Sequence, residues 1–121
     1  MKSQKYIDKN DMYKSIYDFS LHIDEAIGIG KKINFKKNYN KISNIVLCGM
    51  GGSAIGGDLS SSLARHSLSV PVQVNRNYTL PSWVNNETLV ICSSYSGNTE
   101  ESLSAYHEAL SKGSKIVGIS T

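Results

Sequence analysis

Residues 45–58 read IVLCGMGGSAIGGD, a short apolar run that ends at a glycine-rich turn and leads into a helical pattern. The run has no polar alternation, which is typical of a strand buried on both faces of a parallel sheet. Ile55, Leu59 and Leu63 then recur at helical spacing. These residues predict a strand, a tight turn and a helix, the opening unit of an α/β fold.

The same alternation continues along the chain. Three further strands are predicted at Val70–Val74, Thr88–Cys92 and Ile116–Ile119. A short helix before the third strand is left open as an alternative. The fold class predicted is α/β, a doubly wound parallel sheet in the flavodoxin-like order. No helix follows the last strand, so we expect the sheet to be incomplete at the C-terminus, or covered by a partner.

The helix before the fourth strand is predicted from its cap and its apolar stripe. Asn98 is the expected N-cap, with Glu101 as the reciprocal capping partner. Leu103, Tyr106 and Leu110 are the expected buried face.

Residues 1–44 are predicted to be a separate N-terminal part, followed by the partial domain 45–121. Asp11 is the expected cap of a single helix, which Gly28 and Gly30 end, and a polar connector follows. The apolar positions of this helix recur at steps of three and four: Met12, Ile16, Phe19, Ile23 and Ile27.

Composition and motif spacing narrow the function classes. The net charge is +3, and the lysines near residues 31–41 lack the aromatic interleaving expected of a nucleic-acid surface. No signal peptide or membrane span is visible, so we expect a cytoplasmic protein without nucleic-acid or membrane partners. Cys48 and Cys92 have no CxxC spacing and are expected to be small buried thiols, and no metal site is predicted.

Two turns carry the functional signal. In the flavodoxin-like order the first and third strands are neighbours, and ligands bind in the crevice at their carboxyl ends. The first turn offers backbone amides at a helix start, which suit an anion: Gly51, Gly52 and Ser53. The second turn offers hydroxyls, an amide and a second helix start: Ser94, Ser96, Gly97, Asn98 and Thr99. Together they predict a phosphate-binding site.

A dinucleotide site is the rival interpretation. Gly49, Gly51 and Ala54 satisfy G-x-G-x-x-A after a strand. That motif expects an acidic residue at the end of the second strand, where Asn75 and Arg76 stand instead. NAD is therefore disfavoured, while Arg76 leaves an NADP-binding half-domain open.

Three segments resemble the bifunctional phosphoglucose/phosphomannose isomerases, which belong to the sugar isomerase (SIS) domain proteins. They are GMGGSAIGGD at 49–58, RNYTLP at 76–81 and SYSGNTEE at 94–101. The resemblance implies a five-stranded SIS sheet and no metal or organic cofactor. It places the phosphate of a glucose, mannose or fructose 6-phosphate on Ser94, Ser96 and Thr99, and the sugar beside Gly52 and Ser53.

The resemblance also implies what these residues lack. The family's catalytic Glu and its assisting His, Lys and Arg lie beyond the matching region, so no catalytic residue is predicted in residues 1–121. We expect the N-terminal part of a sugar-phosphate isomerase that is homodimeric at full length, and a chain inactive alone. The alternatives are a non-catalytic SIS module that senses sugar phosphates and, less favoured, the NADP-binding half-domain.

Overall fold

The computed structural model describes residues 8–35 and 39–121, and the chain divides into two compact units, 1–38 and 39–121. The first unit contains α2 (Met12–Tyr17) and α3 (Phe19–Lys31). The prediction of one continuous helix is therefore wrong, because the helices meet at Asp18. Gly28 and Gly30 lie inside α3 rather than at its end.

Asp11 stands at the N-cap position of α2, as predicted, but the side chain of another residue binds the first amides of the helix. Asp11 has a left-handed backbone (φ 52°) and makes no side-chain cap. Asp8 accepts hydrogen bonds from the amides of Met12 (2.7 Å) and Tyr13 (2.8 Å) instead. Those two bonds favour the ionised carboxylate and lower the pKa of Asp8.

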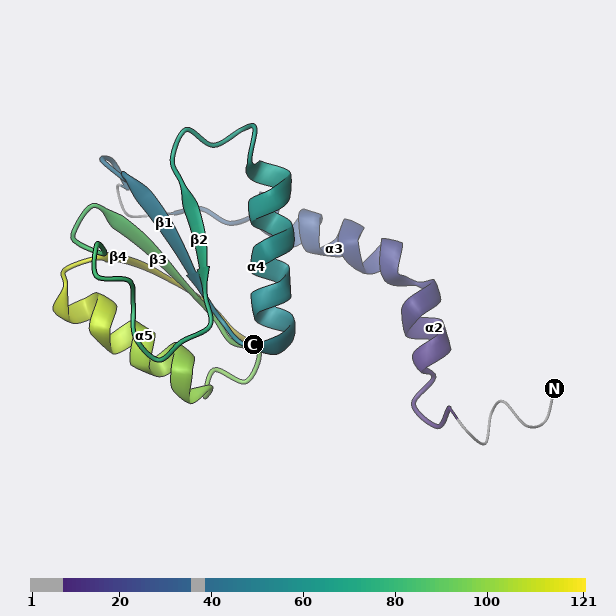
Figure 1. The fold of residues 1–121 in the computed structure, drawn as a ribbon. Coiled ribbons are helices and arrows are strands. Elements are labelled where there is room, and N and C mark those ends of the chain that lie inside the picture. The colour runs from purple at the N-terminus through teal and green to yellow at the C-terminus, as the bar shows by residue number, and fades with distance from the viewer. Residues whose placement is uncertain (1–7, 36–38) are drawn as a thin grey trace. The chain divides into compact units, whose positions relative to one another are not determined.

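The second unit is a four-stranded parallel sheet, with one helix connecting the first two strands and another connecting the last two (Figure 1). Its elements in chain order are β1 (Asn44–Cys48), α4 (Gly51–Ala64), β2 (Val72–Asn75), β3 (Thr88–Ser93), α5 (Glu100–Ser111) and β4 (Lys115–Ile119). The spatial order is β2-β1-β3-β4, all parallel. This confirms the predicted doubly wound α/β fold in flavodoxin-like order. The described residues contain four strands where the resemblance implies five, and no helix separates β2 from β3.

The two helices cover opposite faces of the sheet (Figure 1). A Cβ added at Gly57 of α4 would lie 3.5 Å from Leu47 and Val74, so α4 packs closely on β1 and β2. Val46 and Val90 face the other way and are fully buried beneath α5. Because side chains alternate along a strand, β1 supplies both faces with apolar residues.

The buried face of α5 differs from the predicted one. Ala105 and Ala109 have no exposed surface, whereas Leu103, Tyr106 and Leu110 are 38%, 38% and 52% exposed. The small alanines let the helix backbone approach the sheet, and the larger side chains lie to the side. The spacing of apolar residues favoured the larger side chains, because it reflects their hydrophobicity. It carries no information about the space between the helix and the sheet.

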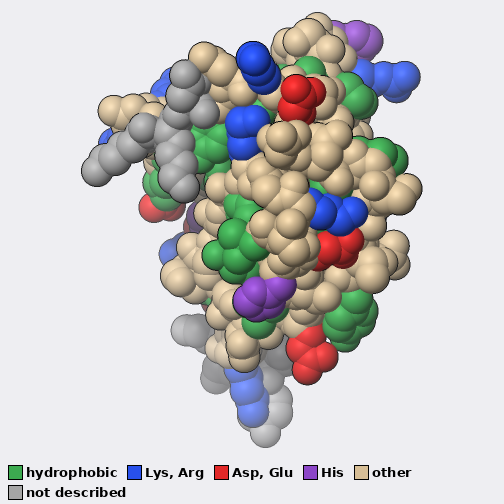
Figure 2. All heavy atoms as spheres, turned by 90° about the vertical axis from the view of Figure 1, so that its left-hand side faces the viewer, with side chains coloured by type: hydrophobic (Ala, Val, Ile, Leu, Met, Phe, Trp, Pro, Cys, Tyr) green, Lys and Arg blue, Asp and Glu red, His purple; other side chains and the backbone are tan. Residues whose placement is uncertain are grey.

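The surface carries mixed charge. Figure 2 shows Lys and Arg side chains scattered among Asp and Glu on the face that it presents. One such pair is defined on α5, where Lys112 Nζ lies 3.3 Å from Glu108 Oε1. No helix in the described parts of the chain has the length and apolar content needed to cross a membrane.

The packing of α5 gives a stability prediction. Ala105→Leu forces a larger side chain between helix and sheet and should lower the free energy of unfolding by about 1–3 kcal/mol. Leu110→Ala, on the same helix but half-exposed, should cost less than about 1 kcal/mol. Urea unfolding followed by circular dichroism measures both, and equal losses would mean that Leu110 belongs to the buried face.

Candidate functional site

The turns after β1 and β3 both lie at the edge of the sheet formed by the carboxyl ends of its strands. The two strands pair in parallel from Asn44↔Thr88 to Cys48↔Cys92, so β1 ends opposite Cys92, one residue before the end of β3. Gly49 then passes so close to β3 that an added Cβ would lie 3.0 Å from the Ser93 carbonyl oxygen. The predicted adjacency of the two turns is therefore present in the fold.

The first turn opens directly into α4. Gly51 begins the helix with φ +51°, a conformation that glycine adopts readily. The amides of Ser53 and Ala54 donate to the Met50 carbonyl at 3.1 and 3.4 Å. Met50 is the N-cap and supplies no side-chain cap. The amides of Gly51 and Gly52 belong to the first turn, where a helix leaves N–H groups without internal partners.

The second turn is organised by its own hydroxyls. The Ser94 and Thr99 hydroxyl oxygens lie 2.7 Å apart, and Ser94 is 8% exposed. The Gly97 amide donates to the Ser94 carbonyl (3.1 Å), with Gly97 at φ +68°. The Asn98 amide donates to Ser96 Oγ (3.2 Å). The turn thus holds Ser94 and Thr99 inward, while Ser96, Gly97 and Asn98 remain exposed.

The predicted cap of α5 is wrong. Thr99 is the N-cap, not Asn98, and no side chain caps this helix end. The Thr99 hydroxyl contacts Ser94 instead of its own helix. Glu101 therefore has no capping-box partner, and the first turn of α5, which carries Glu100 and Glu101, has amides that no side chain caps.

The two turns differ in how they contribute to the cavity beside them. A cavity of about 230 Å³ beneath the first turn is lined by Gly49, Ser53 and Ser93 among others. The hydroxyls of Ser94, Ser96 and Thr99 do not line it. The turns are side by side, but this cavity reaches the first turn and not the hydroxyls of the second.

The acidic residues at the start of α5 are directed at a neighbouring segment. Glu100 Oε2 accepts a hydrogen bond from the Tyr78 hydroxyl (3.3 Å). The negative charges of Glu101 and Glu100 raise the pKa of the Tyr78 phenol. This contact engages Glu100 with the segment 76–81.

Two residues that the sequence did not single out hold that segment. Asn75 is 5% exposed and its Nδ2 donates to the carbonyls of Asn77 (3.1 Å) and Thr79 (3.2 Å). Glu108 Oε2 accepts from the Leu80 amide (2.7 Å). A polar residue at the end of an apolar strand was the available signal for Asn75; nothing in the sequence marks Glu108.

The two cysteines lie side by side beneath the turns. Cys48 is 2% exposed and sits opposite the half-buried Cys92 in the register of β1 and β3. The hydrogen bond with Cys92, together with burial, raises the pKa of the Cys48 thiol. No three His, Cys, Asp or Glu side chains within residues 8–35 and 39–121 gather so as to hold a metal ion.

Known proteins share extended sequence identity with this chain. The chain is 48% identical over 110 residues to the bifunctional phosphoglucose/phosphomannose isomerase of Caldicellulosiruptor bescii, covering 91% of this chain and 32% of that protein. It is 45% identical over 86 residues to the Aquifex aeolicus protein of the same name, covering 70% of this chain and 27% of that one. The chain is homologous to part of these isomerases. It spans about a third of their length.

Solved structures give the same fold. A Clostridium difficile protein assigned as a phosphosugar isomerase matches with a TM-score of 0.60 at 20% identity, over 90% of this chain and 29% of that one. Tagatose-6-phosphate ketose/aldose isomerase from Escherichia coli matches with a TM-score of 0.51 at 26% identity, over 67% of this chain and 24% of that one. No family model matches the chain. The homology to the phosphoglucose/phosphomannose isomerases and the fold of phosphosugar isomerases agree.

The close passage at Gly49 gives a second prediction. Gly49→Ala places a Cβ against the Ser93 carbonyl and should lower the free energy of unfolding by about 1–3 kcal/mol. Gly52→Ala is the matched control, because its Cβ would meet no atom within 4 Å. The control should be neutral or slightly stabilising. Thermal unfolding of both variants measures this; equal melting temperatures would contradict the tight contact between the first turn and β3.

Proposed function

We propose that the turns after β1 and β3 hold the phosphate group of a hexose 6-phosphate, and that this chain contributes that site to an aldose–ketose isomerase. The observation that carries the proposal is the pairing of two uncapped helix starts, at Gly51 and Glu100, at one edge of a parallel sheet. Each offers free amides and the positive end of a dipole.

The hydroxyl-rich turn favours phosphate over other anions. Three hydroxyls lie within one six-residue turn, those of Ser94, Ser96 and Thr99. A phosphate has several oxygens that can accept hydrogen bonds from them. Thr99 already contacts Ser94, so it is held in place before any ligand arrives. The sugar would then extend toward Gly51, Gly52 and Ser53 on the neighbouring turn.

The homology narrows the ligand class. The curated relatives are named for phosphoglucose and phosphomannose, so the ligand class proposed is a phosphorylated hexose. The three segments that resemble the family are the two turns and the segment 76–81, and all three lie at the edge just described. Glucose 6-phosphate and mannose 6-phosphate are therefore the substrates proposed, with fructose 6-phosphate as product.

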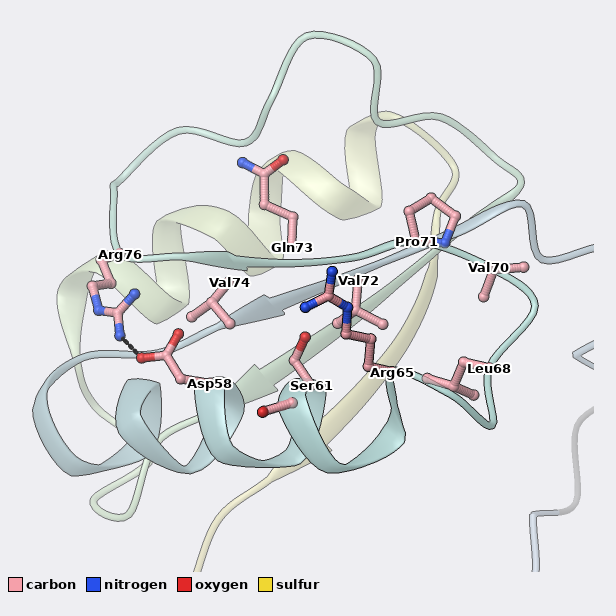
Figure 3. Close-up of a pocket in the computed structure, with 11 residues that line it drawn as sticks. Asp58, Ser61, Arg65, Leu68, Val70, Pro71, Val72, Gln73, Val74 and Arg76 are labelled. Carbon is pink, nitrogen blue, oxygen red and sulfur yellow. Dashed lines mark hydrogen bonds and ion pairs between the residues drawn. The ribbon is translucent and has the colours of Figure 1, made fainter.

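The NADP alternative loses support in the structure. Arg76 is the residue that would meet a 2′-phosphate, and its guanidinium is paired with Asp58 of α4 (Figure 3). A phosphate would have to compete with this carboxylate and would be repelled by it. The hydroxyls of the second turn also have no role in that scheme.

Isomerisation needs a base that the proposal does not assign to this chain. Moving a proton between C1 and C2 requires a group within about 3 Å of the carbon-bound proton. Glu100 and Glu101 are on the phosphate side, and Glu100 is engaged with Tyr78. We therefore expect residues 1–121 to bind sugar phosphate and to show no isomerase activity by themselves.

Substitution of the turn hydroxyls tests the proposal. Ser96→Ala combined with Thr99→Ala removes two donors to a charged ligand and should weaken glucose 6-phosphate binding about tenfold or more, by calorimetry. Ser67 follows α4 and lies at the other end of the strands, before β2 begins. Ser67→Ala should therefore leave affinity unchanged. Glucose, which lacks the phosphate, should not bind measurably.

The double variant also needs a check on folding. Loss of the Ser94–Thr99 contact should lower the free energy of unfolding by about 0.5–1.5 kcal/mol, which leaves the fold intact if circular dichroism is unchanged. A folded double variant with the affinity of the unmodified chain would refute the assignment of the second turn.

A further inference from the structure

β2 is an edge strand with a free hydrogen-bonding side. It pairs with β1 alone among the described residues. The carbonyls of Pro71 and Asn75 accept from amides of the β1 segment at 2.9 and 3.2 Å. Because hydrogen-bonding direction alternates along a strand, Val72 and Val74 direct their N–H and C=O groups away from the sheet. Pro71 lacks an N–H, but its backbone faces β1, so the free side keeps both donors.

A large hollow lies on the α4 side of this edge (Figure 3). Its volume is about 640 Å³, and its apolar wall includes Leu68, Val72 and Val74. Arg65 rises from the end of α4 toward β2, and its guanidinium has no hydrogen bond or ion pair with the described residues (Figure 3). The hollow thus combines apolar surface with one uncompensated positive charge, since the other arginine is paired with Asp58.

A second hollow lies along the same edge. It has a volume of about 350 Å³ and is lined by Pro71, Gln73 and Trp83 among others. Gln73 points away from α4, opposite to Val72 and Val74 (Figure 3). Trp83 is 43% exposed, an unusual position for the largest apolar side chain in the chain. The free edge is therefore flanked by a basic hollow on the α4 side and an aromatic one that Gln73 helps to line.

We propose that this edge binds an extended peptide segment of a partner protein, which adds to β2 as a further strand. Side chains of an added strand alternate between the two faces. One set would enter the hollow with Arg65 and is expected to be acidic; the other would pack against Trp83 and is expected to be apolar. The free donors and acceptors of Val72 and Val74 would supply the backbone hydrogen bonds.

A strand fits this place better than a small anion. Arg65 is the C-cap of α4, where the negative end of the helix dipole disfavours a free phosphate. An acidic side chain on an added strand is also held by the backbone hydrogen bonds of that strand to β2. Its binding therefore does not depend only on the electric field at the end of α4. This site is also separate from the turns at Gly51 and Ser96, and it does not rest on the proposed function.

Peptides of alternating glutamate and valine test the proposal. Acetylated, amidated EVEVEVE should produce a saturable change in the fluorescence of Trp83, the single tryptophan of the chain. Arg65→Glu should weaken binding about tenfold or more, because like charges then face each other. Lys115→Glu makes the same charge change on β4, at the other side of the sheet, and should leave affinity unchanged, as should Ser96→Ala with Thr99→Ala.

N-methylation distinguishes strand addition from simple charge pairing. Only alternate amides of an added strand face β2. Of two peptides, one N-methylated at every glutamate and one at every valine, one should lose binding and the other should keep it. The proposal is overturned if both bind like the unmodified peptide, if KVKVKVK binds equally well, or if Arg65→Glu has no effect. It is also overturned if sedimentation shows the chain pairing with a second copy through this edge and EVEVEVE does not compete.

Discussion

The register between β1 and β3 is the constraint on which the candidate site depends. Cys48 lies opposite Cys92, so β1 ends one residue before β3 and the following turns start side by side. Gly49 makes this possible, since its missing side chain leaves room for the Ser93 carbonyl. A shift of one residue would also move Gly49 away from the Ser93 carbonyl and put a residue with a Cβ there, so this close passage favours the observed register. The positions of two helix starts, and of the groups they offer to an anion, follow from that single pairing.

Much of the fold could be predicted from the sequence because the central strands β1 and β3 are largely apolar and alternate with helical patterns. Such strands read as continuous apolar runs, and each of the four predicted runs overlaps the observed strand. The flavodoxin-like order expected for this alternation then makes the first and third strands neighbours and places the glycine and serine turns side by side. The order β2-β1-β3-β4 agrees with that inference. The residues of both turns were found from their chemistry, and their roles in binding stay predictions.

The features that the sequence missed depend on distances between layers and between segments. The buried face of α5 is made by Ala105 and Ala109, because the helix lies too close to the sheet for larger residues. Thr99 stands at the N-cap position of α5, but its hydroxyl contacts Ser94 and leaves the helix without a side-chain cap. Asn75 and Glu108 both hold the segment 76–81. The contact between Glu108 and Leu80 joins residues that are 28 positions apart in the chain. Each relation depends on side-chain contacts that periodicity and capping rules do not describe.

The central claim is that two turns, far apart in sequence, offer their amides to one anionic group. Two-dimensional amide NMR of the ¹⁵N-labelled chain, titrated with glucose 6-phosphate, tests it directly. The account predicts that the amides of Gly51 and Gly52 and those from Ser96 to Glu101 shift together along one binding curve, while amides at the opposite edge, such as that of Ser67, do not move. Shifts confined to one turn, or two curves with different affinities, would contradict it.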